Sequence, residues 1–186
     1  MKRTIVSMAL AAALSAAAGT LPAGSTITGT TSSSTGLLGL DSAFADVPGS
    51  HVTALAAADL EYLTGDYQLA IDFFTDGLVQ FWDNGGLGSL AGSTTLVFSF
   101  AGLSEDITGF TLADMSALTA GSVTTSVLGP HGVSITLNDV AFSTAFASFT
   151  VQIDTASAVP EPGSLALLSS GLALLLAARR RGPSNR

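Results

Sequence analysis

Residues 67–82 read YQLAIDFFTDGLVQFW, and this stretch indicates the fold of the chain. From Tyr67 to Phe73, large apolar or aromatic side chains occupy every second position, which is the period of a β-strand with two different faces. Thr75-Asp76-Gly77 then supplies turn residues, and a second apolar run begins at Leu78. A strand, a turn and a strand in this order predict a β-hairpin.

The alternation continues toward the C-terminus. Gly, Asn and Asp punctuate the pattern, and one such turn is expected at Asn138-Asp139. Together with the hairpin, seven or eight short strands predict an all-β fold, an antiparallel β-sandwich or jelly roll, over residues 46–158. The further strands are expected at 96–100, 110–112, 123–127, 133–137, 140–142 and 149–153.

Two segments that precede the hairpin have other patterns. Gly24 to Gly39 is rich in Ser, Thr and Gly and offers little apolar surface to bury, so residues 24–45 are expected to form a spacer. Between His51 and Leu63, apolar residues recur at roughly helical spacing, which predicts a short helix.

The charges of the chain are divided between its ends and its middle. All fourteen acids lie between Asp41 and Glu161, whereas the six cations lie before Thr4 or after Ala178. A segment without Lys or Arg cannot neutralise a phosphate backbone, so nucleic acid is excluded as a partner. The same segment can form no Lys or Arg salt bridge of its own, and with no cysteine in the chain its fold must depend on apolar burial and hydrogen bonds.

The N-terminus has the layout of a secretory signal peptide. A cationic start, MKRT, precedes the apolar stretch IVSMALAAALSAAAG, so signal peptidase is expected to remove residues 1–23 or a similar segment. Three sites satisfy the preference for small residues, and they would cut after Ala18, Ala23 or Ala45. The pattern does not choose between them, and cleavage could be as late as residue 45.

The C-terminus carries a second apolar span. Residues 163–178 contain no charge and would measure about 24 Å as a helix, against roughly 30 Å of hydrocarbon. This predicts a short transmembrane helix in the bacterial inner membrane, with the following arginines snorkelling to one interface. Cations beside an apolar span favour the cytoplasmic side, so the acidic middle of the chain is expected outside the cytoplasm.

The elements that flank this span resemble the PEP-CTERM sorting signal, over Val159–Arg181. They are a Pro-Glu-Pro sequence and a basic cluster, namely Pro160, Glu161, Pro162, Arg179, Arg180 and Arg181. The resemblance implies processing by an exosortase, an integral-membrane thiol peptidase of Gram-negative bacteria that make extracellular polysaccharide. It also implies a transient inner-membrane anchor for a periplasmic domain that is later moved to the cell surface or matrix.

The prolines of this motif have a physical consequence of their own. Each proline lacks an N–H and disfavours helix for the residue before it, so Val159–Glu161 should be extended. An extended segment suits insertion into a protease cleft.

Candidate catalytic residues are few. The two histidines are His51 and His131, and the second lies in a Gly-Pro-His-Gly sequence that is typical of a turn. No G-x-S-x-G sequence surrounds a serine, so neither a nucleophile elbow nor a catalytic triad is predicted.

Two pairs of acids are further candidates for catalysis. Glu105 and Asp106 are adjacent, so on a strand they would point to opposite faces, and a loop position is expected instead. Asp59 and Glu61 form a looser pair. Catalytic residues, cofactors and a specific metal site are therefore not predicted, although weak binding of divalent ions by the acidic surface is expected.

One segment partly matches a calcium loop. Asp72 to Asp83 fits a twelve-residue EF-type loop at positions 1, 5, 6 and 12, but Phe74 occupies the third position. The hairpin interpretation is preferred.

Three aromatic residues are candidates for stacking on sugars: Tyr62, Tyr67 and Trp82. Aromatic side chains at alternating positions are more often part of the core, and a core position is the expectation here.

These observations predict an exported, exosortase-processed envelope or matrix protein, non-catalytic and associated with exopolysaccharide through binding, packing or charge. Two alternatives stay open. A secreted polysaccharide hydrolase would need a pocket that gathers two acids, or His with Ser, at hydrogen-bonding distance. A permanently anchored surface binding protein would keep its C-terminal tail.

Overall fold

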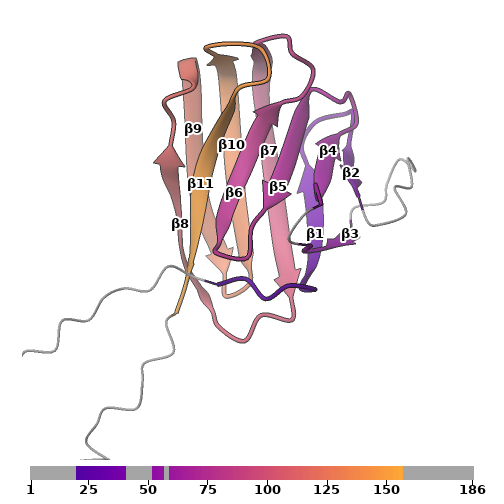
Figure 1. Cartoon of the computed structure of the whole chain (residues 1–186), viewed down its shortest axis with the longest axis vertical. Helices are drawn as coiled ribbons and strands as arrows, with labels where there is room; N and C mark the ends of the chain where they lie inside the picture. Colours follow the sequence, from indigo (N-terminus) through magenta and orange to yellow (C-terminus); the bar gives the residue numbers. More distant parts are fainter. Residues whose placement is uncertain (1–19, 41–51, 57–58, 157–186) are drawn as a thin grey trace, which may run out of the picture.

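Two antiparallel β-sheets pack face to face in the computed structural model, which describes residues 20–40, 52–56 and 59–156 (Figure 1). The five-stranded sheet has the order β3-β1-β7-β10-β9, and the six-stranded sheet has the order β2-β4-β5-β6-β11-β8. In Figure 1, β5, β6 and β11 lie in front of β7 and β10. The all-β sandwich predicted from the alternating pattern is confirmed.

The strands differ widely in length. The five-stranded sheet consists of β1 (Thr26–Thr31), β3 (Val52–Ala54), β7 (Ser89–Ala101), β9 (Leu118–Gly129) and β10 (Gly132–Phe142). The six-stranded sheet consists of β2 (Leu37–Gly39), β4 (Tyr62–Thr64), β5 (Leu69–Phe73), β6 (Leu78–Asp83), β8 (Ile107–Asp114) and β11 (Ser148–Thr155).

The hairpin predicted over residues 67–82 is formed by β5 and β6. Ile71 pairs with Phe81, and both side chains are fully buried between the sheets. Gly77 has a φ of 84°, a left-handed conformation that favours glycine. The Asp76 carboxylate accepts a hydrogen bond from the backbone N–H of Leu78 at 3.1 Å, which stabilises the turn.

Aromatic side chains from both sheets form the centre of the core. Phe73 of β5 and Phe98 of β7 meet edge to face with ring centroids 5.0 Å apart, while Phe81 and Phe149 stack within the six-stranded sheet. The buried hydroxyl of Tyr62 donates a hydrogen bond to the carbonyl of Ile27 at 2.7 Å. This bond joins the two sheets across the core.

The segment expected to be a spacer contributes two strands instead. β1 lies between β3 and β7, and β2 pairs with β4 at one edge of the other sheet. Leu21, Ile27 and Leu37 are at most 1% exposed. The Ser/Thr/Gly composition conceals this role, because both strands depend on partners supplied by distant parts of the chain. Residues 41–45 of the expected spacer lie outside the described residues.

The helix expected between His51 and Leu63 is also wrong. Val52–Ala54 forms β3, which pairs with β1, and Tyr62–Thr64 forms β4, which lies between β2 and β5. A short apolar run has weak preferences of its own, and here the available strand edges decide its conformation. His51 itself lies outside the described residues.

The turn expected at Asn138-Asp139 is a β-bulge within β10. The register with β7 shifts between Asn138 and Val140, and Asp139 has a φ of 46°. Its carboxylate accepts a hydrogen bond from the N–H of Gly92 on β7 at 2.7 Å. The bulge lets one strand continue past turn-forming residues, which joins the strands predicted at 133–137 and 140–142.

The described chain begins and ends at the same end of the sandwich, beside the β5–β6 turn (Figure 1). The backbone N–H of Leu21 donates a hydrogen bond to the carbonyl of Thr75 at 2.8 Å. The backbone N–H of Ala156 donates a hydrogen bond to the carbonyl of Asp106 at 2.7 Å. The transmembrane helix expected at 163–178 lies outside the described residues. Within the residues that are described, no helix is long and apolar enough to cross a membrane.

Candidate functional site

Among the described residues, the candidate catalytic residues of the sequence do not assemble into a common site, while His51 lies outside them. His131 lies in the β9–β10 turn, and its Nε2 is 3.9 Å from a carboxylate oxygen of Asp106, with side chains 46% and 69% exposed. Glu105 and Asp106 lie in the loop between β7 and β8, as their adjacency predicted. The histidine and this acidic pair thus form a solvated contact near the point where the described chain ends.

The segment from Asp72 to Asp83 forms the hairpin rather than a cation-binding loop. Asp76 caps the turn, while Asp83 is 1% exposed and accepts a hydrogen bond from the N–H of Gly88 at 2.9 Å. Across the described ranges, no group of three or more His, Asp or Glu side chains is placed to hold a metal ion.

Buried Glu61, directly before β4, and half-buried Asp72 of β5 form a pair of carboxyl groups. Tyr62 pairs with Ile71, so the preceding Glu61 lies opposite Asp72. Glu61 is 1% exposed, and its two oxygens accept hydrogen bonds from the N–H groups of Ala56 at 3.1 Å and Phe73 at 2.7 Å. The sequence analysis missed this pair, because only the strand register reveals it.

Burial dominates the protonation of this pair. It raises the pKa of Glu61 to about 8, against the opposing effect of the two backbone N–H groups, and the charge of Asp72 raises it further. Burial also raises the pKa of Asp72. Near neutral pH the pair therefore retains a proton, which avoids placing two negative charges side by side in a buried position.

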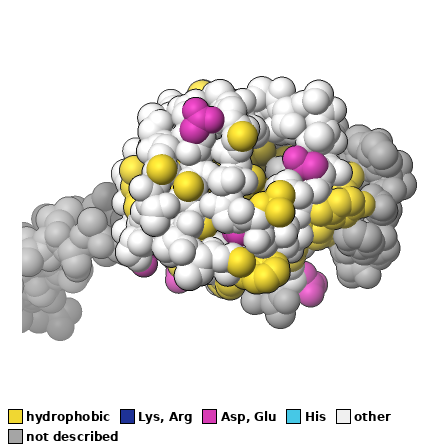
Figure 2. Space-filling view, turned by 90° about the horizontal axis from the view of Figure 1, so that it is seen from above, with side chains coloured by type: hydrophobic (Ala, Val, Ile, Leu, Met, Phe, Trp, Pro, Cys, Tyr) yellow, Lys and Arg dark blue, Asp and Glu magenta, His cyan; other side chains and the backbone are white. Residues whose placement is uncertain are grey.

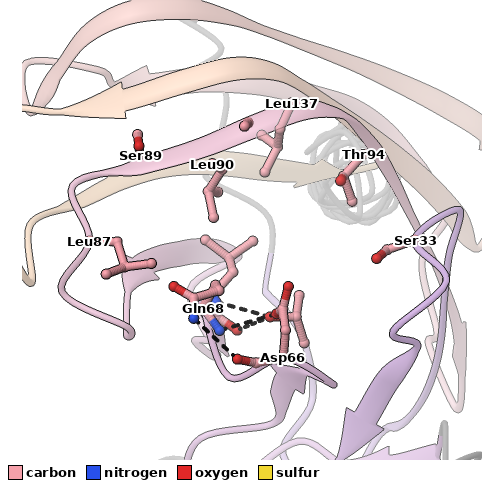
Figure 3. Close-up of a pocket in the computed structure, with 11 residues that line it drawn as sticks. Ser33, Asp66, Gln68, Leu87, Ser89, Leu90, Thr94 and Leu137 are labelled. Carbon is pink, nitrogen blue, oxygen red and sulfur yellow. Dashed lines mark hydrogen bonds between the residues drawn. The ribbon is translucent and has the colours of Figure 1, made fainter.

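A cleft opens between the two sheets at the end opposite the β5–β6 turn (Figure 3). Its volume is about 410 Å³, within the usual range for small-molecule sites. Leu90 of β7 and Leu137 of β10 line one wall, and Asp66 and Gln68 lie on the wall across from them (Figure 3).

The chemistry of this cleft is mild. Hydroxyl groups of Ser33, Ser89 and Thr94 accompany the leucines, and Asp66 is the one titratable residue in its lining. The Asp66 carboxylate accepts a hydrogen bond from the N–H of Gln68 at 3.2 Å. Such a lining can hold a small uncharged molecule through apolar contact and hydrogen bonds.

A second hollow, of about 400 Å³, lies on the outer face of the six-stranded sheet. Its lining includes Trp82, Phe146, Asp72 and Asn84. The expectation that the three candidate aromatics lie in the core holds for Tyr62, which is fully buried. The expectation is wrong for Trp82, which is 37% exposed because it occupies an outward-facing position of β6. It is also wrong for Tyr67, which is 41% exposed in the loop between β4 and β5.

The surface at the cleft end carries one sign of charge. Figure 2 shows separate acidic side chains and several hydrophobic groups on this face, with no Lys or Arg among the described atoms. The absence follows from the sequence, which has no cation between Thr4 and Ala178. Anionic ligands are therefore disfavoured over the whole described surface.

Comparison with known proteins identifies one feature of the chain. The family model of the PEP-CTERM protein-sorting motif matches residues 158–181, which include all six residues that the sequence analysis assigned to the motif. No curated protein and no solved structure matches the chain. The chain thus carries a PEP-CTERM sorting motif in its C-terminal tail, and this motif implies an exported, surface-sorted protein that an exosortase processes.

Proposed function

We propose that the sandwich is a non-catalytic component of the extracellular polysaccharide matrix, delivered by its sorting motif and cut free of its membrane tail. The observation that carries this proposal is the position of the motif. β11 ends at Thr155, and the motif begins at residue 158. A cut within the motif therefore releases every strand of the sandwich, so the sorted product is the whole folded domain.

The position of β11 inside its sheet requires that cleavage occur after Thr155. β11 pairs with β6 on one side and with β8 on the other, and Phe149, Val151 and Ile153 are fully buried. A cut upstream of Thr155 would shorten an internal strand and expose core residues. The processing site and the fold are thus compatible only if cleavage occurs after β11.

Within the part of the chain that the structure describes, Glu61 and Asp72 lie opposite each other but do not suit a hydrolase. A retaining glycosidase separates its carboxyl groups by about 5 Å and an inverting enzyme by more, so that the sugar or a water fits between them. Both oxygens of Glu61 instead accept backbone N–H groups, those of Ala56 and Phe73, so this carboxyl group is already committed to holding the fold. This geometry supports a structural role for the pair and a non-catalytic protein.

Substitution of the two motif prolines tests the processing step. In a host that contains an exosortase, the wild-type chain is expected to lose the apolar span and the basic cluster. The double variant Pro160→Ala with Pro162→Ala should keep its full tail and stay in the membrane fraction, because the segment before each proline is no longer held extended. Intact mass of envelope and supernatant fractions measures this.

A matched control is Pro183→Ala, which changes a proline beyond the basic cluster. This variant should be processed like the wild type. A wild-type product that retains residues 163–181 would contradict processing and favour a permanent anchor. Normal processing of the double variant would show that the motif prolines are not required.

Retention by the matrix is tested separately. The processed wild-type chain should sediment with the matrix and become soluble when the polysaccharide is digested. In a strain that cannot make the polysaccharide, the chain should appear in the medium. If it stays with the cells after the polysaccharide is removed, the matrix role is wrong even if processing occurs as expected.

A further inference from the structure

The outer hollow, defined by the lining residues Leu60, Ala70, Asp72, Trp82, Asn84 and Phe146, combines features of a ligand site. Its floor is formed where Ala70 of β5 pairs with Trp82 of β6. Since Trp82 is 37% exposed, a flat apolar surface remains available to a ligand on the outside of the sheet.

Phe146 borders the same hollow in an unusual conformation. Its φ is 61°, which non-glycine residues rarely adopt, and its side chain is 66% exposed. The ring lies against Gly86, where an added Cβ would come within 2.8 Å of the Phe146 Cζ atom. Glycine at position 86 therefore permits the ring to lie where it does.

Buried Asp83 ties the two loops at this border to each other. One of its carboxylate oxygens accepts hydrogen bonds from the N–H of Gly88 at 2.9 Å and the N–H of Phe146 at 3.4 Å. The loop after β6 and the loop before β11 are thereby joined. The Phe146 side chain is therefore held outward by a constrained backbone. A ligand that contacts the ring would not have to order this loop first.

The polar groups of the hollow suit hydroxyl groups rather than charges. Asn84 donates through Nδ2 to the carbonyl of Tyr67 at 2.8 Å, which leaves its Oδ1 atom as an acceptor. Asp72 adds a carboxyl group from the neighbouring strand. The lining contains acids and no cation, so a phosphate, sulfate or uronate would be repelled.

We infer that this hollow binds a neutral sugar ring of a polysaccharide, with Trp82 and Phe146 against its apolar faces and Asp72 and Asn84 hydrogen-bonded to its hydroxyls. Aromatic surface beside a few convergent polar groups, in a hollow of about 400 Å³, is the composition such a ligand requires. The inference rests on the proposed matrix function and names the ligand class for it.

The chain offers a direct probe of this site, because Trp82 is its single tryptophan. The processed protein, purified from culture, is titrated with neutral and with uronate-containing oligosaccharides prepared from the polysaccharide of the producing strain. The neutral fraction should change the tryptophan emission saturably, whereas the uronate fraction should have little effect.

Phe146→Ala keeps the fluorescent probe and removes one aromatic wall. We expect binding up to about tenfold weaker, since the loss of one aromatic contact amounts to at most about 1.4 kcal/mol. Leu128→Ala is the matched control, because this side chain is 57% exposed on β9 of the other sheet. Thermal unfolding of each variant establishes that it is folded, and calorimetry extends the series to Trp82→Phe and Trp82→Ala.

The outcomes separate the site from the function. An emission that does not respond to the neutral fraction, or equal binding by Phe146→Ala and the wild type, would overturn the sugar site while matrix retention could still hold. Saturable binding without matrix retention would support the site and contradict the proposed function. An emission change that depends on protein concentration alone would identify a second copy of the chain as the occupant, and the inference would fail.

Discussion

A chain that begins at Asp46 is expected to remain unfolded, whereas a chain that begins at Thr20 should fold. β1 is an internal strand, with three residue pairs to β3 and six to β7. Loss of the segment before Asp46 would expose the edge of β7 at 96–101 and remove buried side chains that include Leu21, Ile27 and Leu37. Burial of three such side chains contributes roughly 5–9 kcal/mol, which is comparable with the whole stability of a small domain.

Circular dichroism and tryptophan emission of the two chains would measure this difference. The chain from Thr20 should show cooperative unfolding, and the chain from Asp46 should show the spectrum of a disordered polypeptide. Cooperative unfolding of the shorter chain with similar stability would mean that β1 and β2 are dispensable, contrary to their burial.

Burial also favours one of the three predicted signal-peptidase sites. A cut after Ala23 would remove Leu21, which is 1% exposed and whose N–H bonds to Thr75, and a cut after Ala45 would remove β1 and β2 as well. Of the three predicted cuts, the one after Ala18 keeps both Leu21 and the strands β1 and β2. The exported protein should therefore begin at Gly19, and N-terminal sequencing that finds Gly24 or Asp46 would contradict this.

Stability is expected to fall as the pH rises from about 4.5 to about 8. Glu61 has an ordinary pKa of 4.5 in the unfolded chain and one of about 8 in the folded protein. Over this interval the folded state holds a proton that the unfolded state has lost, so deprotonation favours unfolding. The stabilisation is fully present below the unfolded value and is lost as the pH passes the folded value. The free energy of unfolding should fall by at most about 5 kcal/mol over this interval.

Glu61→Gln isolates this contribution. The variant loses an acceptor for one of two backbone N–H groups, so it should be less stable at pH 5. Because it cannot titrate at this position, its stability should depend less on pH than that of the wild type. Glu105→Gln, on the β7–β8 loop, serves as the matched control and should keep the wild-type slope. Denaturant unfolding at pH 5, 6.5 and 8 measures the free energy of unfolding of each variant. If this free energy changes with pH equally in the wild type and in Glu61→Gln, the shared proton is ruled out.

Local patterns were enough to predict the strands between Tyr67 and Ile153, since alternation records which side chains face the core. The β5–β6 hairpin is the clearest example, because its turn residues and its buried face are adjacent in sequence. Local patterns failed for β1 to β4, because β1 is poor in apolar residues and the other three strands are only three residues long. Their conformation depends on strand edges supplied from elsewhere in the chain, such as β7 for β1.

The candidate sites show the same division. The sorting motif was readable because its signal is linear, namely a proline sequence, an apolar span and arginines in a fixed order. The Glu61–Asp72 pair and the hollow beside Trp82 were not, because both depend on the register of neighbouring strands. Aromatic alternation suggested a core position for Trp82 and could not tell which face of β6 is covered.

By itself the sequence determined the sandwich class, the confinement of cations to the two ends and the sorting motif of the tail, because each of these is written in adjacent residues. The tertiary structure alone decided that the Ser/Thr/Gly-rich segment is part of the sandwich, that buried Glu61 lies opposite Asp72, and that two aromatic rings border one hollow. The physical reason is that burial and pairing between distant residues are properties of the assembled sheets, which no local periodicity contains.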